Sequence, residues 1–161
     1  SGANLSGADL SGADLSGADL SGANLSRAKG VKPELCTPLL MLLEQPGPIR
    51  AYKLVNADGV GPFNGGIKYE VGQTYEEPAA NTNVTEQCAP GLNVATLDWC
   101  LKEWRAGYRV LLVEFTAADI AAIPTATDGK FRVRRLTVVG EKDMSALVAK
   151  PESAPMVGKA D

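Results

Sequence analysis

The N-terminal segment of the chain repeats every five residues. An Ala recurs at every fifth position from residue 3 to residue 28, and the first five of them are each followed two positions later by Leu5, Leu10, Leu15, Leu20 and Leu25. The position between that Ala and Leu is always Asp or Asn. A period of five fits neither the 3.6-residue turn of an α-helix nor the two-residue alternation of a strand. A flexible Gly/Ser linker would not keep Leu at one phase. We therefore expect a regular structure in which these leucines occupy equivalent places.

The unit Ala-(Asp/Asn)-Leu-X-X resembles that of the pentapeptide-repeat family, and the resemblance covers residues 1–29. It implies a right-handed square β-helix with five residues on each face, in which the central Leu points inward. Four such faces make one coil, so the segment supplies little more than one coil. Solenoid repeats bury their faces by stacking, and at least about three units are normally needed. We therefore expect the segment to stack on the next domain, on another subunit or on further repeats.

The remainder of the chain has the composition of a folded protein, with 45% hydrophobic and 22% charged residues in a total of 161. Its patterns predict an α+β fold with a mostly antiparallel sheet. The expected strands are residues 49–55, 67–71, 109–115 and 130–139, and the expected helices are residues 38–45, 97–104 and 116–124. The expected domains are a repeat coil (1–29), a linker with a helix that caps the coil (30–48), an α+β domain (49–145) and a polar tail (146–161).

Several classes of chemistry are excluded or disfavoured by composition. The chain has no His, which excludes Ser-His and Cys-His nucleophiles and the common zinc hydrolases. The spacing of Cys36, Cys88 and Cys100 fits no metal site, and we expect three free thiols and no cofactor. The net charge of −3 arises in the repeat, and the rest is neutral, so neither nucleic acid nor an anionic membrane is an expected partner. There is no apolar run of 18 residues and hence no predicted membrane span.

One dense basic cluster lies in the last expected strand. Strand alternation places Phe131 and Val133 inward and Lys130, Arg132 and Arg134 outward. The functional interpretation is a patch for an anion or an acidic partner, and the other interpretation is a solvated strand face that blocks edge-to-edge aggregation. The cluster consists of Lys130, Arg132, Arg134 and Arg135.

A second resemblance rests on four ordered segments: residues 69–75 (YEVGQTY), 88–93 (CAPGLN), 113–115 (VEF) and 130–133 (KFRV). Together they resemble a family of uncharacterised domains in bacteriophage and prophage proteins, over about residues 50–140. The family usually has His where this chain has Asn93. The resemblance implies a phage context and no particular activity. The polar loop at residues 78–89, between two of these segments, is expected to become ordered only against a partner.

These observations favour a non-enzymatic structural or interaction protein. We expect a virion accessory subunit, either a head decoration or a tail-associated protein, that assembles in the bacterial cytoplasm and docks through its repeat coil. Its expected partners are other protein subunits, of its own kind or of the virion, and no small-molecule substrate is expected. One alternative is a nucleotide- or NAD-using transferase with Glu114 as its acid. A second is a DNA-mimicking inhibitor, provided that further repeats precede residue 1.

Overall fold

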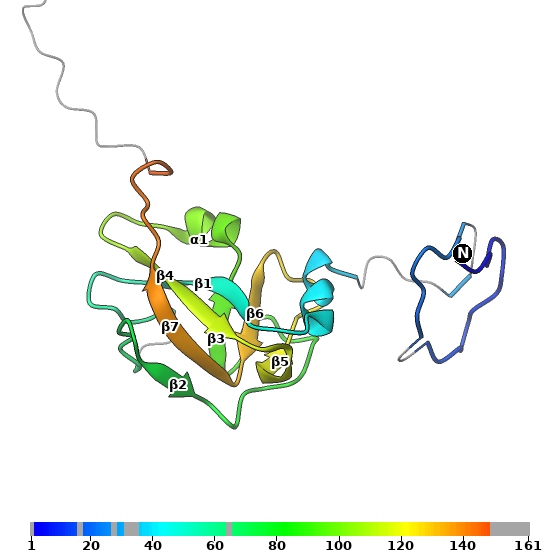
Figure 1. The fold of residues 1–161 in the computed structure, drawn as a ribbon, viewed down its shortest axis with the longest axis horizontal. Coiled ribbons are helices and arrows are strands. Elements are labelled where there is room, and N and C mark those ends of the chain that lie inside the picture. Colours follow the sequence, from blue (N-terminus) through cyan, green and yellow to red (C-terminus); the bar gives the residue numbers. More distant parts are fainter. Residues whose placement is uncertain (1, 16–17, 27–28, 31–35, 64–65, 149–161) are drawn as a thin grey trace, which may run out of the picture. The chain divides into compact units, whose positions relative to one another are not determined.

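The protein is described here from a computed structural model that covers residues 2–15, 18–26, 29–30, 36–63 and 66–148. The chain divides into two compact units, Ser1–Thr37 and Pro38–Asp161. Each unit is described by itself (Figure 1). The expected C-terminal tail lies almost wholly outside the described residues.

The first unit is built from one turn that recurs with the five-residue period. The backbone N–H of Ala8 donates to the carbonyl of Leu5 at 3.0 Å, and the same bond recurs one, two and three repeats later. The glycine between them has a positive φ, +73° at Gly7, as the third residue of a type II turn requires. The preceding Asp or Asn accepts the N–H of the Ser two residues on, at 2.9–3.0 Å. The described repeats thus close a turn through hydrogen bonds between residues two or three positions apart.

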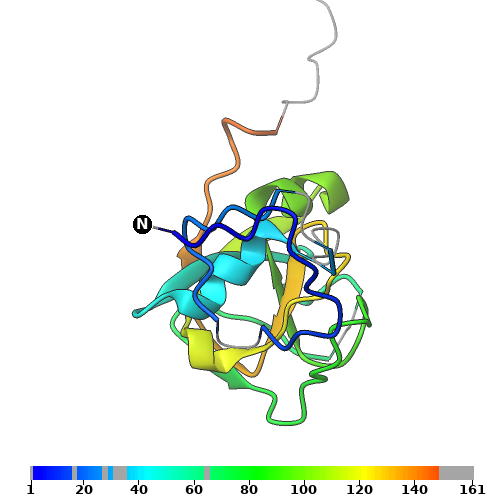
Figure 2. The same cartoon turned by 90° about the vertical axis from the view of Figure 1, so that its right-hand side faces the viewer.

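The square β-helix coil that the resemblance implies is not observed. Among the described residues, the start and the end of this unit meet in two isolated parallel bridges, Asn4–Asn24 and Asp9–Lys29, and one further backbone hydrogen bond, from Gly7 N–H to the Ser26 carbonyl at 2.7 Å. The described residues of this unit form no strand. Figure 2 shows the segment in blue as a loop that turns back on itself. Leu15 is 38% exposed, and the other four leucines of the repeat are half-buried. The physical reason is that a ladder needs a neighbouring layer for each face, and residues 1–29 supply about one lap.

The second unit is an open seven-stranded sheet in the order β2-β7-β4-β1-β3-β6-β5, and every neighbouring pair is antiparallel. The strands are β1 (Ile49–Val55), β2 (Thr74–Glu76), β3 (Leu92–Ala95), β4 (Arg109–Phe115), β5 (Ile120–Ala122), β6 (Lys130–Val133) and β7 (Arg135–Glu141). The described residues contain one α-helix, α1 (Leu97–Glu103), and two 3-10 helices, η2 (Pro38–Glu44) and η3 (Ala117–Asp119). The predicted α+β class is therefore wrong, because this unit is mostly antiparallel sheet.

The differences arise where strand pairing overrides local preference. The expected helix at 116–124 forms only the three-residue η3, because Ile120–Ala122 pairs with β6 as β5. Thr116 and Asp119 nevertheless form a capping box at the start of η3. The expected strand at 130–139 is two strands, and the expected strand at 67–71 makes a single bridge between Val60 and Lys68. By contrast, the strands at 49–55 and 109–115 are confirmed and pair over their full length.

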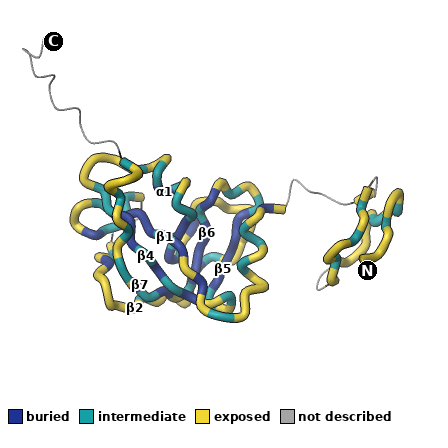
Figure 3. Tube along the Cα trace, turned by 45° about the horizontal axis from the view of Figure 1, so that its top comes forward, coloured by how far each residue is buried: buried dark blue, intermediate teal, exposed yellow. Residues whose placement is uncertain are grey.

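The sheet packs on both faces. The larger core contains residues from six strands, with Phe131, Leu111 and Leu136 at its centre, and Leu39, Leu40 and Leu42 of η2 pack against it. On the other face, Cys100 of α1 packs with Leu54, Ala95 and Val110. Figure 3 shows that much of the buried chain of this unit lies in its strands, whereas β2 has no buried residue. The expected apolar helix at 38–45 is thus covered in part by its own domain, while Met41 stays 62% exposed.

Candidate functional site

Arg132, the centre of the expected basic cluster, is buried. Its side chain is 0% exposed, and its guanidinium donates to the carbonyls of Asn81 (3.0 Å), Asn83 (2.8 Å) and Glu86 (2.7 Å). The expectation that Arg132 faces solvent is wrong, because the loop at residues 78–89 folds over that face of β6. The same bonds correct the expectation for the loop, which is ordered by this arginine of its own chain.

The other three cations of the cluster have separate partners. Lys130 Nζ lies 3.2 Å from Cys88 Sγ and 5.9 Å from the centre of the Trp99 ring. Arg134 donates to the carbonyl of Ile120 at 3.1 Å. Arg135 forms an exposed ion pair with Glu76 at 3.3 Å. The structure therefore does not bring Lys130, Arg132, Arg134 and Arg135 together as one anion-binding patch.

A pocket of about 480 Å³ opens beside β1 and β3. Lys53 of β1 and Asn93 of β3 line it, together with Phe63, Tyr69 and Trp99. Three of the four segments that resemble phage domains contribute to it, since residue 69, residues 88–91 and 93, and Lys130 are all part of its lining. Segments distant in the sequence thus meet at one concave surface, which is the usual form of a small-molecule site.

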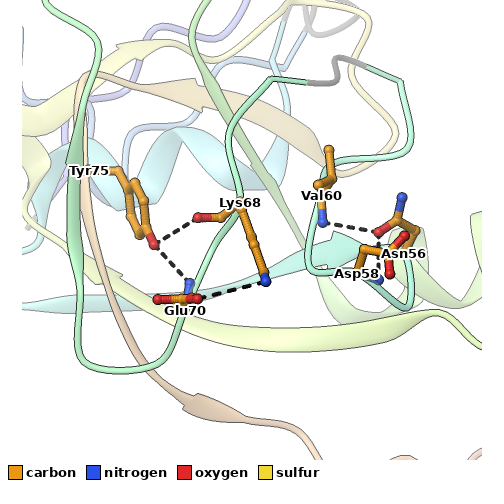
Figure 4. A network of polar contacts seen from close by, with 6 residues as sticks. All are labelled: Asn56, Asp58, Val60, Lys68, Glu70 and Tyr75. Carbon is orange, nitrogen blue, oxygen red and sulfur yellow. Dashed lines mark hydrogen bonds and ion pairs between the residues drawn. The ribbon is translucent and has the colours of Figure 1, made fainter.

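Tyr69 is held in the pocket wall by a local polar network. The Tyr75 hydroxyl donates to the carbonyl of Lys68 at 2.9 Å and accepts the N–H of Glu70 at 2.8 Å. Lys68 and Glu70 also form an ion pair at 3.9 Å, and the two tyrosine rings lie 4.7 Å apart. Figure 4 shows the two hydrogen bonds of Tyr75 and the Lys68–Glu70 ion pair, beside the turn in which Asn56 accepts two backbone N–H groups. The YEVGQTY segment therefore uses its second tyrosine to position its first.

The side chain of Lys53 ends in an ammonium group that is buried in the floor of the pocket. This ammonium donates to the carbonyl of Asn93 at 2.6 Å, and Nζ lies 4.4 Å above the centre of the Tyr69 ring. The described residues place no carboxylate within ion-pair distance of it. Burial lowers the pKa of Lys53 from 10.5 to about 8, and burial also raises the pKa of the nearby Cys100 thiol to about 12.

Asn93, where the second resemblance leads us to expect His, also lines the pocket. Its Nδ2 donates to the carbonyl of Gly91 at 3.2 Å, whereas Oδ1 is buried and has no hydrogen-bond partner in the described part of the chain. A carboxamide cannot replace imidazole as a general base near neutral pH. The residue therefore contributes a dipole and a backbone acceptor for Lys53 rather than proton transfer.

The burial of Lys53 predicts a pH dependence of stability. Its pKa in the folded state is about 8 and in the unfolded state about 10.5, so the unfolded state binds more protons between these values. Burial of the ammonium costs about 3 kcal/mol below pH 8, and this cost disappears as the pH rises through 10.5. We therefore compare the unfolding free energies of Lys53→Met and wild type. The value for the variant minus the value for wild type is expected to fall by about 3 kcal/mol between pH 7 and pH 10.5.

Urea unfolding of both proteins across this pH range measures that difference. The alkaline titrations of Tyr69 and Cys100 change the unfolding free energies of both proteins, so they cancel in the difference. Lys68→Met, at an exposed position, is the control and is expected to follow the wild-type profile. A difference for Lys53→Met that is flat with pH would show that the ammonium is not desolvated.

Glu114, the acid of the expected transferase, lies elsewhere. It belongs to β4 and accepts from Arg50 Nε at 3.1 Å, next to a smaller hollow of about 210 Å³. Among the described residues, no three Cys, Asp or Glu side chains are placed to hold a metal ion, and no helix has the length and apolar character of a membrane span. Cys36, Cys88 and Cys100 are free in the structure.

The sequence comparisons concern the first unit. A family model described as pentapeptide repeats (8 copies) matches residues 1–29. No curated protein and no solved structure matches the chain. Residues 50–140, where the second resemblance lies, are outside the match. The turns, the phase of the leucines and this match agree, and residues 1–29 are a pentapeptide-repeat segment.

Proposed function

We propose that the chain is a non-enzymatic accessory subunit of a bacteriophage or prophage particle, on the head or the tail, that docks through its repeat segment (residues 1–29). Its partners are other protein subunits, of its own kind or of the particle. The phage setting rests on the resemblance of residues 50–140 to phage domains. The docking role rests on the repeat segment itself.

The observation that carries the docking role is the exposure of the repeat leucines. Leu15 is 38% exposed, and none of Leu5, Leu10, Leu20 and Leu25 is fully buried within its own unit. The turns recur with the five-residue period, so each Leu lies next to an equivalent turn and keeps part of its apolar surface uncovered by its own unit. Burying one Leu is worth about 1.5–3 kcal/mol, and a second protein surface that covers them would gain this energy.

Leu15→Asp in the full chain is expected to weaken association by about ten- to a hundredfold, because each tenfold step corresponds to about 1.4 kcal/mol. Association is measured by sedimentation for self-assembly and by co-purification with particles from a lysogenic host. Asn24→Asp is the matched control, since it adds the same charge and keeps the acceptor for the Ser26 N–H. A wild-type chain that stays monomeric and absent from particles would contradict the proposal.

No feature of the described residues specifically favours the two alternatives. The acid assigned to a transferase, Glu114, is paired with Arg50 and lies outside the large pocket. A DNA mimic needs a long acidic rod, whereas residues 1–29 carry three acidic side chains, Asp9, Asp14 and Asp19.

A further inference from the structure

We infer that the pocket beside Lys53 is a binding site for a small molecule that joins a flat aromatic ring to one anionic group, a phosphate or a carboxylate. This goes beyond the docking role, which uses the other unit of the chain. The pocket volume of about 480 Å³ lies within the range of about 300–1,000 Å³ that is typical of small-molecule sites.

The anionic group is inferred from the unbalanced charge of Lys53. Buried ammonium groups are normally paired with an anion, because desolvation of an unpaired charge is costly. Here the described partners are a neutral carbonyl and the face of the Tyr69 ring. An ammonium has three N–H donors, and one hydrogen bond is observed, so donors remain for the oxygens of a ligand.

The surrounding charges agree with an anionic ligand. Lys130 lies on the same pocket and adds a second cation, with Cys88 as its contact. Glu77 is the acidic residue of the lining, and its Oε1 already accepts the N–H of Ala79 at 3.1 Å within a turn. Two cations and one acid that is engaged elsewhere leave the pocket electropositive.

The flat ring is inferred from the aromatic side chains of the pocket. Phe63 is 61% exposed, and its ring meets that of Trp99 edge to face, with centroids 6.2 Å apart. Large exposed aromatic side chains at a concave surface commonly mark a binding site. A planar ring that stacks on Phe63 or Trp99 would cover this surface, while an attached anion reaches toward the floor.

The test is calorimetric titration of the full chain at pH 7 with two sources of this chemistry. One arm uses the four common nucleoside 5′-monophosphates, and the other uses indole-3-acetate and 4-hydroxybenzoate. Nucleosides without phosphate and inorganic phosphate alone supply the half-ligands. At least one complete compound is expected to bind at one site per chain, at least tenfold more tightly than its half-ligands. If the nucleotides bind, the anionic group is a phosphate, and if the aromatic acids bind, it is a carboxylate.

Three variants place the binding in this pocket. Phe63 is exposed, so Phe63→Ser leaves the core intact. This variant is expected to lower the affinity for the complete compound at least tenfold. Lys53→Met is expected to remove the advantage of the anion, so that a nucleotide and its nucleoside bind alike. Arg50→Met removes an exposed cation of β1 that is not part of the pocket lining, and it is expected to leave the affinity unchanged.

The pH profile of the wild-type chain is a second readout. Affinity for the anionic compound is expected to fall as the pH rises above about 8, where free Lys53 loses its proton, while affinity for the uncharged half-ligand stays level. Glu77, Cys88, Cys100, Lys130, Tyr52 and Tyr69 are the other titratable groups around the ammonium, and the Lys53→Met profile separates their contribution. No binding of any compound at about 1 mM, or binding that Phe63→Ser and Lys53→Met leave unchanged, would overturn the inference.

Discussion

Arg132→Met is expected to lower the unfolding free energy by about 3–5 kcal/mol. The variant removes a buried guanidinium and leaves the carbonyls of Asn81, Asn83 and Glu86 without their donor. Each unsatisfied buried polar group costs about 1–3 kcal/mol, and methionine recovers part of the loss through packing. Urea unfolding at pH 7 measures the change, and limited proteolysis reports whether the loop at residues 78–89 has opened.

Arg135→Met is the control for Arg132→Met. It also removes one arginine from the same basic cluster, but its ion pair with Glu76 is exposed. Exposed pairs contribute about 0–1 kcal/mol, so this variant should differ little from wild type. Equal losses for the two variants would show that the buried hydrogen bonds of Arg132 do not order the loop.

Gly129→Ala is expected to cost about 3–5 kcal/mol, from strain and overpacking together. Gly129 has a φ of +138°, and a Cβ there would lie 2.3 Å from Thr96 Oγ1 and 2.9 Å from Trp99 Cβ. The carbonyl of Gly129 also accepts the Thr96 N–H at 3.0 Å, which joins the start of α1 to the start of β6. A methyl group would force these elements apart. Chemical denaturation measures the loss.

Gly107→Ala separates the two contributions to that cost. Gly107 has a φ of +88°, and a Cβ there would meet no atom within 4 Å. Its variant should therefore show only the backbone cost of a left-handed residue, about 1–2 kcal/mol. If both variants lost the same free energy, close approach at Gly129 would not be the reason for its glycine.

The candidate site was only partly visible in the sequence. Tyr69, Asn93 and Lys130 lie in segments that the second resemblance identifies, but nothing local predicts that they line one pocket. Lys53 was missed, although a lysine within the apolar strand IRAYKLV was an available signal. Its burial depends on Tyr69 and Asn93, which lie 16 and 40 positions later in the chain.

The strands and helices also differ in how far the sequence predicts them. Strands 49–55 and 109–115 and the helix after Thr96 follow from periodicity and capping residues within a few positions. The short strands β3 and β5 do not, because each has four residues or fewer and gains its stability from pairing with β6. This is why a helix-capping signal at Thr116 predicted too long a helix.

By itself, the sequence determined the corner turns of the repeat, the long central strands and the absence of histidine chemistry. Each of these depends on residues within about one turn of one another or on composition alone. Only the tertiary structure decided that Arg132 is buried, that its loop is ordered, and that Lys53 lies in a pocket where the described residues place no carboxylate in ion-pair contact with it. The reason is physical: whether a charge is desolvated depends on which distant segment closes over it, and strand alternation specifies a face without specifying what covers that face.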